Sequence, residues 1–106
     1  MLADRADIAD TSIKRKIGLL KHSGLEPGEG LWITPCEAVH TIGMKFPIDV
    51  LFLDRKRRVL KVRSDMPRWR MSGSLFAHSV LELPSGTAAA TGTVRGDQLE
   101  FEKYEA

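Results

Sequence analysis

The run Ile48–Leu53 constrains the fold more than any other part of this chain. It is apolar except for Asp49. A strand with one face in water alternates apolar and polar residues, so a run that is apolar on both faces predicts a strand in the interior of a sheet. The polar residues 54–58 follow, and Val59–Arg63 then alternates apolar with basic side chains. This pattern predicts a β-hairpin made of the two strands.

Further short strands are expected on both sides of this hairpin. Leu31–Thr34 is closed by Pro35, and Ser79–Leu83 is ended by Pro84. Proline cannot donate to a sheet ladder, so both segments should stop there. Residues 99–102 alternate apolar and acidic side chains, which predicts a last, half-exposed strand.

One helix is predicted near the N-terminus. Thr11 or Ser12 can cap it, and Gly24 is placed to end it. Its buried face would be formed by three apolar residues at i, i+4, i+7 spacing: Ile13, Ile17 and Leu20. A single helical turn is expected at 87–92.

These segments predict a mainly β or α+β fold, a small curled sheet or barrel of short strands closed on one side by the N-terminal helix. With 106 residues, 42% of them hydrophobic, we expect one globular domain over 1–106, with its core at about 11–104. The only cysteine, Cys36, excludes an internal disulfide. No apolar run reaches the ~20 residues of a membrane span, and the sequence as given shows no secretory leader. We therefore expect a cytoplasmic protein without membrane association.

The charges are unevenly distributed, although the formal net charge is only +2. Between Arg55 and Arg70 the single acid, Asp65, stands among many basic residues, whereas the tail from Asp97 onward is mostly acidic. If the two segments lie side by side in a sheet, opposite charges can pair across strands, each exposed pair contributing about 0.2–1 kcal/mol. The small net charge and the lack of a recognition motif argue against nucleic acid as a partner.

Several blocks of this sequence occur together in one order. They are Arg15–Leu20, His40–Met44, Pro47–Asp54, Leu81–Thr87 and Gly96–Asp97. In this combination the chain resembles the uncharacterised proteins grouped as domain of unknown function 192. Leu20 replaces the methionine that usually ends the family's helix, and many relatives carry tryptophan, methionine and asparagine in the block of Pro35-Cys36 and His40-Thr41. The resemblance implies a compact, mostly β domain and brings no established activity or cofactor.

Cys36, His40 and Met44 offer a thiolate, an imidazole and a thioether, which are the ligands of blue-copper sites. Four residues along an extended strand span about 13 Å, too far to share one ion, so the three would have to converge in a folded-back loop. A second histidine would have to come from His22 or His78. We therefore predict no metal and no cofactor, and expect Cys36 and Met44 to pack as apolar side chains.

A catalytic site made of Cys36, His40 and Asp49 is the alternative interpretation. His40 would act as base for the thiol and Asp49 would orient the imidazole, in a hydrolase or a metal-dependent enzyme. Asp49 is better placed to cap the loop that enters the central strand, and His40 can satisfy backbone groups of an irregular connection. The balance favours a protein without catalytic activity.

The favoured interpretation is a binding or accessory module. Segments 40–44 and 68–70 carry polar and aromatic side chains that the scaffold does not need. We expect a shallow pocket between them for a small anionic ligand or a partner's peptide. Trp69 would stack on the ligand or, alternatively, fold onto the barrel mouth. The predicted contact residues are His40, Thr41, Met44, Arg68, Trp69 and Arg70.

Overall fold

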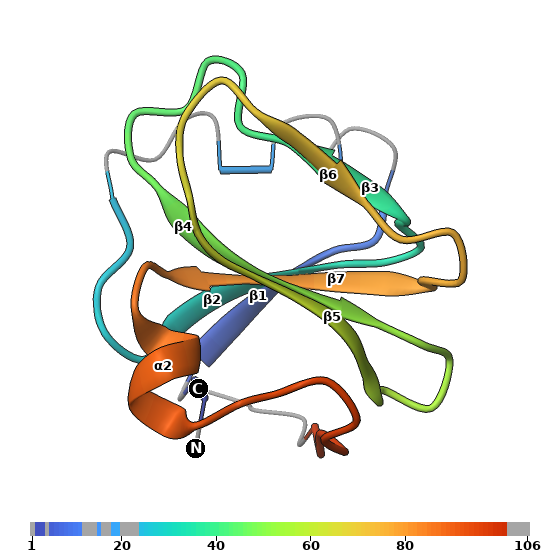
Figure 1. Cartoon of the computed structure of the whole chain (residues 1–106). Coiled ribbons are helices and arrows are strands. Elements are labelled where there is room, and N and C mark those ends of the chain that lie inside the picture. The colour runs from blue at the N-terminus through green and yellow to red at the C-terminus, as the bar shows by residue number, and fades with distance from the viewer. Residues whose placement is uncertain (1, 4, 12–14, 16–17, 20–23, 102–106) are drawn as a thin grey trace.

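The computed structural model describes residues 2–3, 5–11, 15, 18–19 and 24–101. Strands and one short helix have defined bounds in these ranges (Figure 1). They are β1 (Arg5–Ala9), β2 (Glu29–Ile33), β3 (Ala38–His40), β4 (Ile48–Leu53), β5 (Val59–Met66), β6 (Met71–Gly73), β7 (Ser79–Pro84) and α2 (Thr87–Thr91). Within the same ranges, no helix has the length and apolar character needed to cross a membrane.

Five strands form one mixed sheet in the order β1-β2-β7-β4-β5. β1 runs parallel to β2, and the other neighbouring pairs are antiparallel. β4 and β7 lie inside this sheet, and all of β4 is buried. Burial on both faces is the reason why β4 needs apolar residues at consecutive positions.

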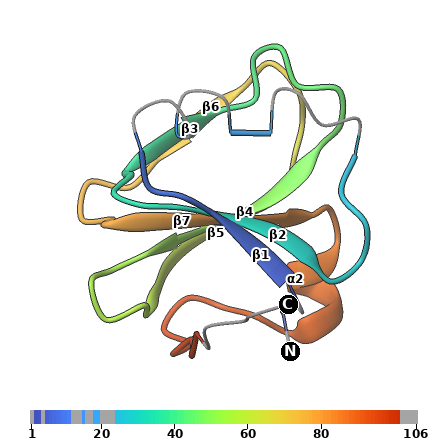
Figure 2. The ribbon, with the colours of Figure 1, turned by 180° about the vertical axis from the view of Figure 1, so that it is seen from behind.

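The two remaining strands, β3 and β6, pair antiparallel and form a separate ribbon. This ribbon lies over one face of the sheet, while α2 and the chain that follows it lie on the other side (Figures 1 and 2). Because side chains alternate along a strand, β4 supplies residues to an apolar cluster on each face. The cluster under the ribbon includes Val39, Ile48, Val50, Phe52 and Val80. The cluster on the α2 face includes Leu51, Leu53, Leu81, Leu83 and Ala88.

The interior position of β4 and its hairpin with β5 confirm the sequence predictions. β2 and β7 confirm the two short strands on either side, each within one or two residues of the predicted bounds. The helical turn predicted at 87–92 is α2. It is flanked by Gly86 and Gly92, with φ of 93° and 67°. These left-handed values suit glycine, which has no Cβ to clash.

Two expectations about the strands were wrong. The sheet does not close into a barrel, because β1 and β5 stand at its two ends and do not pair with each other. The last strand predicted at 99–102 is not formed at 99–101, the part of it that the structure describes. An isolated bridge between Arg58 and Gln98 stands just before it. The acidic and basic segments do approach each other there, but not as paired strands of the sheet.

The helix with defined bounds lies near the C-terminus, not near the N-terminus as expected. Residues 12–14, 16–17 and 20–23 of the predicted N-terminal helix lie outside the described residues. Gly18 is described, and its φ of 49° is left-handed. A right-handed helix therefore does not continue through Gly18, since a left-handed residue interrupts it.

Asp49 is the only ionisable side chain of β4, and it is fully buried on the α2 face. Its Oδ1 accepts hydrogen bonds from the amides of Asp65 (2.7 Å) and Gly86 (3.2 Å). Its Oδ2 accepts a third from the amide of Ala88 (2.7 Å). One carboxylate thus joins β4 to the end of β5 and to the start of α2.

Replacing Asp49 with asparagine should lower the free energy of unfolding by about 2–4 kcal/mol, because a neutral amide accepts more weakly and turns an NH2 group toward buried donors. Asp54→Asn is the matched control. Its Oδ1 also accepts two amides, from Lys56 and Arg58, but in an exposed turn, so its loss should stay below about 1 kcal/mol. Urea unfolding followed by tryptophan fluorescence measures both. Equal losses would show that Asp49 does not join these elements.

Candidate functional site

The segments 40–44 and 68–70, predicted to form one site, lie against each other. Thr41 is fully buried between them. Its amide, carbonyl and hydroxyl all make hydrogen bonds within the protein. The partners are backbone groups of Met44, Pro67, Trp69 and Arg70, at 2.6–3.1 Å. Thr41 therefore joins the two loops, and its polar groups are already used for that purpose.

The other predicted contact residues divide into buried and exposed ones. Met44 is 4% exposed and packs in the cluster under the ribbon, which confirms that it is a core side chain. Trp69 is 60% exposed and packs against neither apolar cluster, and the open sheet has no barrel mouth onto which it could fold. The exposed side chains are His40, Arg68, Trp69 and Arg70. They form an open aromatic and basic surface at one end of the ribbon.

Cys36, His40 and Asp49 are not brought together. Cys36 packs beside the cluster under the ribbon, whereas Asp49 points to the opposite face of the sheet. His40 is exposed on the outer side of β3, because its neighbour Val39 points inward. No hydrogen bond joins any two of these three described side chains, so the predicted base and orienting carboxylate are not in place.

The thiol of Cys36 is held in its protonated form. Burial raises the pKa of Cys36, and the negative charge of Glu82 acts in the same direction. An interaction with the backbone of Ala38 and the charge of Arg15 lower this pKa, but by less than burial raises it. A protonated thiol is a poor nucleophile. The structure also shows no group of three or more histidine, cysteine or acidic side chains suited to a metal, as far as the described residues reach.

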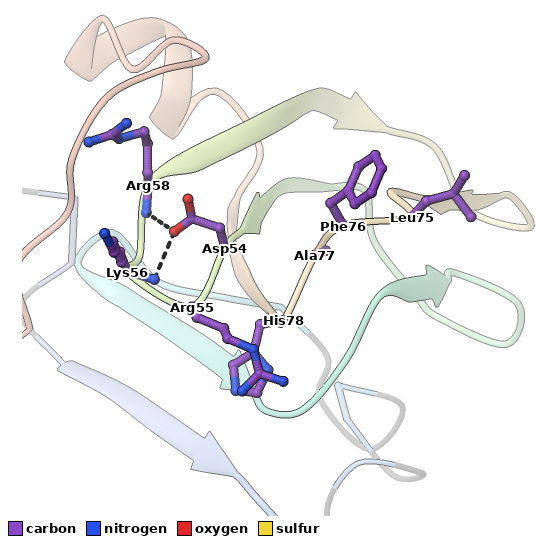
Figure 3. A pocket seen from close by; sticks show the side chains of 8 residues that line it. All are labelled: Asp54, Arg55, Lys56, Arg58, Leu75, Phe76, Ala77 and His78. Atoms are coloured by element: carbon purple, nitrogen blue, oxygen red, sulfur yellow. Dashed lines mark hydrogen bonds between the residues drawn. The ribbon is translucent and has the colours of Figure 1, made fainter.

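A different site lies between the β4–β5 turn and the segment that connects β6 to β7. A hollow of about 530 Å³ opens there (Figure 3). We call it the basic hollow, and it is lined by Asp54, Arg55, Lys56, Arg58, Leu75, Phe76, Ala77 and His78.

The turn side of the basic hollow carries its charge. Asp54 uses its Oδ1 to accept the amides of Lys56 (2.8 Å) and Arg58 (2.9 Å), which holds the turn in shape. The side chains of Arg55, Lys56 and Arg58 are exposed and project from this turn (Figure 3). They form no ion pair with any residue in the described ranges. The hollow therefore attracts anionic groups.

The facing segment supplies the apolar side chains. Leu75 is 88% exposed and Phe76 is 85% exposed. The backbone beneath them is anchored: Ala77 donates to Ser74 (3.1 Å), and His78 donates to Leu53 of β4 (2.8 Å). Two large adjacent apolar side chains left in water on an anchored segment are typical of an interaction site.

Sequence reasoning missed the basic hollow. Residues 55–58 were interpreted as a turn, and Leu75-Phe76 received no role. One signal was present, since two consecutive large apolar residues outside a strand or helix cannot both be explained by a core-facing pattern. Arg57 alone of the four basic residues turns away. Its guanidinium lies over the rings of Trp32 (5.2 Å) and Phe101 (4.6 Å) on the α2 face.

The fold and site define a small, mainly β domain, in which a mixed sheet is covered by a two-stranded ribbon and carries a basic hollow beside the β4–β5 turn. The chain belongs to the DUF192 family, described as an uncharacterized ACR, whose family model matches residues 2–101. This match confirms the resemblance found in the sequence. Among curated proteins, none matches the chain significantly.

Two solved structures share this fold. One is a protein of unknown function from Novosphingobium aromaticivorans, with a TM-score of 0.82 and 24% identity, over 91% of this chain and 74% of that one. The other is a provisionally assigned transcription regulator from Sinorhizobium meliloti, with a TM-score of 0.83 and 22% identity, over 90% of this chain and 79% of that one. Similarity at this level of identity establishes the fold alone.

Glu82 is a second buried carboxyl, and its surroundings differ from those of Asp49. It lies on β7 opposite Leu31 and Val50, on the face under the ribbon, and is 3% exposed. The structure gives its carboxyl no hydrogen bond to any residue in the described ranges. Burial raises the pKa of Glu82 to about 7.

This raised pKa makes stability depend on pH. The stability associated with neutral Glu82 is complete below the usual pKa of 4.5 and is lost as the pH rises through about 7. Glu82→Gln stays neutral, so its free energy of unfolding relative to wild type should increase by about 3 kcal/mol between acidic and mildly alkaline pH. Glu100→Gln, at an exposed position, is the control and should show no such change. Urea titrations across this pH range measure the difference, and a constant difference for Glu82→Gln would contradict the burial argument.

Proposed function

We propose that this protein is a non-enzymatic binding module whose basic hollow docks an acidic segment of a partner protein through an apolar anchor. The observation that carries the proposal is the pair Leu75 and Phe76, each more than four-fifths exposed beside three basic side chains that form no ion pair with the described residues. Covering such side chains contributes about 1.5–3 kcal/mol each. Charges around apolar anchors mainly supply specificity and a fast association rate.

A partner segment fits the basic hollow better than a small anionic ligand does. Small-molecule sites bury most of the ligand between apolar walls. Leu75 and Phe76 project into solvent and enclose little, so they can be covered only by a surface that reaches over them. Apolar anchors surrounded by polar groups are the usual arrangement of protein interfaces.

The surface of His40, Arg68, Trp69 and Arg70 is a second candidate contact for the same class of partner. It stands at the other end of β6, and the loop that carries Trp69 is held to Thr41 by hydrogen bonds. An anchored, exposed aromatic residue between arginines supports a binding role for this surface as well. The enzyme alternative receives no comparable support, because Cys36 and Asp49 lie on different faces of the sheet.

The proposal is tested by selecting peptides from a random display library on the wild-type protein. Selected peptides should be acidic and contain a large apolar residue. The double variant Leu75→Ser/Phe76→Ser should bind them at least about tenfold more weakly, which corresponds to about 1.4 kcal/mol. Ile8→Ser is the matched control, because Ile8 is 49% exposed on β1 and far along the sheet from the hollow. Fluorescence anisotropy gives the affinities.

Three results would decide against the basic hollow. Selected peptides without acidic residues would show that the basic side chains of the hollow do not select the partner. Equal binding by the double variant would show that Leu75 and Phe76 do not contact the peptide. Loss of binding only in Trp69→Ser would show that the peptide binds at the other end of β6. Tighter binding of random duplex DNA, with an affinity that falls steeply with salt, would indicate nucleic acid as the partner instead.

A further inference from the structure

β5 is the last strand of the five-stranded sheet, so its outer edge pairs with no other strand of that sheet. At Val59 this edge is already in use. The amide of Val59 donates to the carbonyl of Asp97, and its carbonyl accepts the amide of Gly96, at 2.8 Å each. An antiparallel bridge joins Arg58 to Gln98 beside them. The chain itself thus begins a neighbouring strand next to β5 and turns away after Val59.

Beyond Val59 the edge of β5 opens into a groove of about 620 Å³, which we call the edge groove. Ser74, at the end of the ribbon, stands on one side, and the segment Thr93–Arg95 that follows α2 stands on the other. The groove follows β5 from Leu60 to Ser64, about 13 Å at the rise of an extended strand. A guest strand of about five residues has this length.

The two faces of this edge differ in chemistry. Lys61 points to the ribbon face, where its Nζ lies 5.5 Å from the centre of the Phe52 ring. Arg63 lies two residues further along β5 and therefore faces the same side. Val62 points to the α2 face and packs against the cluster there. Val94, across the groove, is 58% exposed. The edge therefore offers basic groups on one face and apolar groups on the other.

We propose that the edge groove binds an extended segment of a partner protein as an additional strand, with acidic side chains on the ribbon face and apolar side chains on the α2 face. Strand addition supplies backbone hydrogen bonds, and the alternating side chains supply specificity. Lys61, which lines the groove, and Arg63, on the same face of β5, favour an acidic guest. The carboxylates near the groove are engaged, since Asp97 Oδ2 accepts the amide of Val94 (2.9 Å) and Asp65 accepts the hydroxyl of Ser85.

A second copy of this chain does not fit the edge groove. Antiparallel pairing of two β5 edges would place Lys61 and Arg63 of one copy against the same residues of the other. Like charges directly opposite each other destabilise a strand pair, and natural edges use charged residues to prevent such pairing. The same charges that exclude self-association select an acidic guest.

The test uses a terminally blocked peptide of alternating glutamate and valine, about six residues long. Amide hydrogen exchange of the protein, followed by NMR, should show new protection within residues 60–64 on adding the peptide, and none at 55–58. A fully N-methylated peptide, which lacks ladder donors, should lose at least about tenfold in affinity. A lysine–valine peptide should bind no better than the N-methylated one.

Paired charge reversals separate this proposal from the basic hollow. Lys61→Glu should raise the peptide concentration needed to protect residues 60–64 by about tenfold, whereas Arg55→Glu, on the basic hollow, should leave the protection of residues 60–64 unchanged. The opposite ranking, equal binding of the N-methylated peptide, absence of binding at millimolar peptide, or a dimer that protects 60–64 without peptide would each overturn the proposal. None of these results bears on Leu75 and Phe76, so the two proposals can fail separately.

Discussion

The buried carboxylate of Asp49 is the constraint on which the rest of the structure depends. An ionised group inside a protein is costly unless hydrogen bonds replace its water, so a strand that carries one can be buried only where donors converge on it. The amides that do so belong to Asp65, at the end of β5, and to Gly86 and Ala88, at the start of α2. The position of α2 over the sheet and the pairing of β5 with β4 are thus coupled through one side chain.

Exposed apolar side chains are concentrated away from this buried centre. Trp69, Met71, Leu75 and Phe76 are all more than half exposed, and all lie in or next to β6. The backbone there is held by Thr41 at one end and by the bond from His78 to Leu53 at the other. The sheet therefore carries a ribbon whose connecting segments are held by backbone hydrogen bonds, while several of their large apolar side chains are exposed. An anchored backbone that carries exposed apolar side chains supports a binding role.

The elements that could be predicted were those whose residue pattern reports their burial. β4, its hairpin with β5, β7 and the α2 turn were found because apolar runs and flanking glycine or proline define them locally. β1 was missed because it has too few apolar residues to show a period, and β3 and β6 are three residues each. The approach of segments 40–44 and 68–70 was foreseen from their irregular composition. The role of Thr41 in joining them was not, because its partners are far along the chain.

Residue types determined the buried core, the interior position of β4 in the sheet and the excess of positive charge around its hairpin. These features follow from the local balance of apolar and ionisable side chains. Tertiary structure decided how the charges are used. It directed Arg57 onto two aromatic rings and placed the exposed Arg55, Lys56 and Arg58 beside Leu75 and Phe76. It also treated two buried carboxyls differently, since Asp49 accepts three amides and Glu82 is buried without a hydrogen bond to the described residues. Hydrogen-bond partners and exposure depend on contacts between distant segments, which no local pattern encodes.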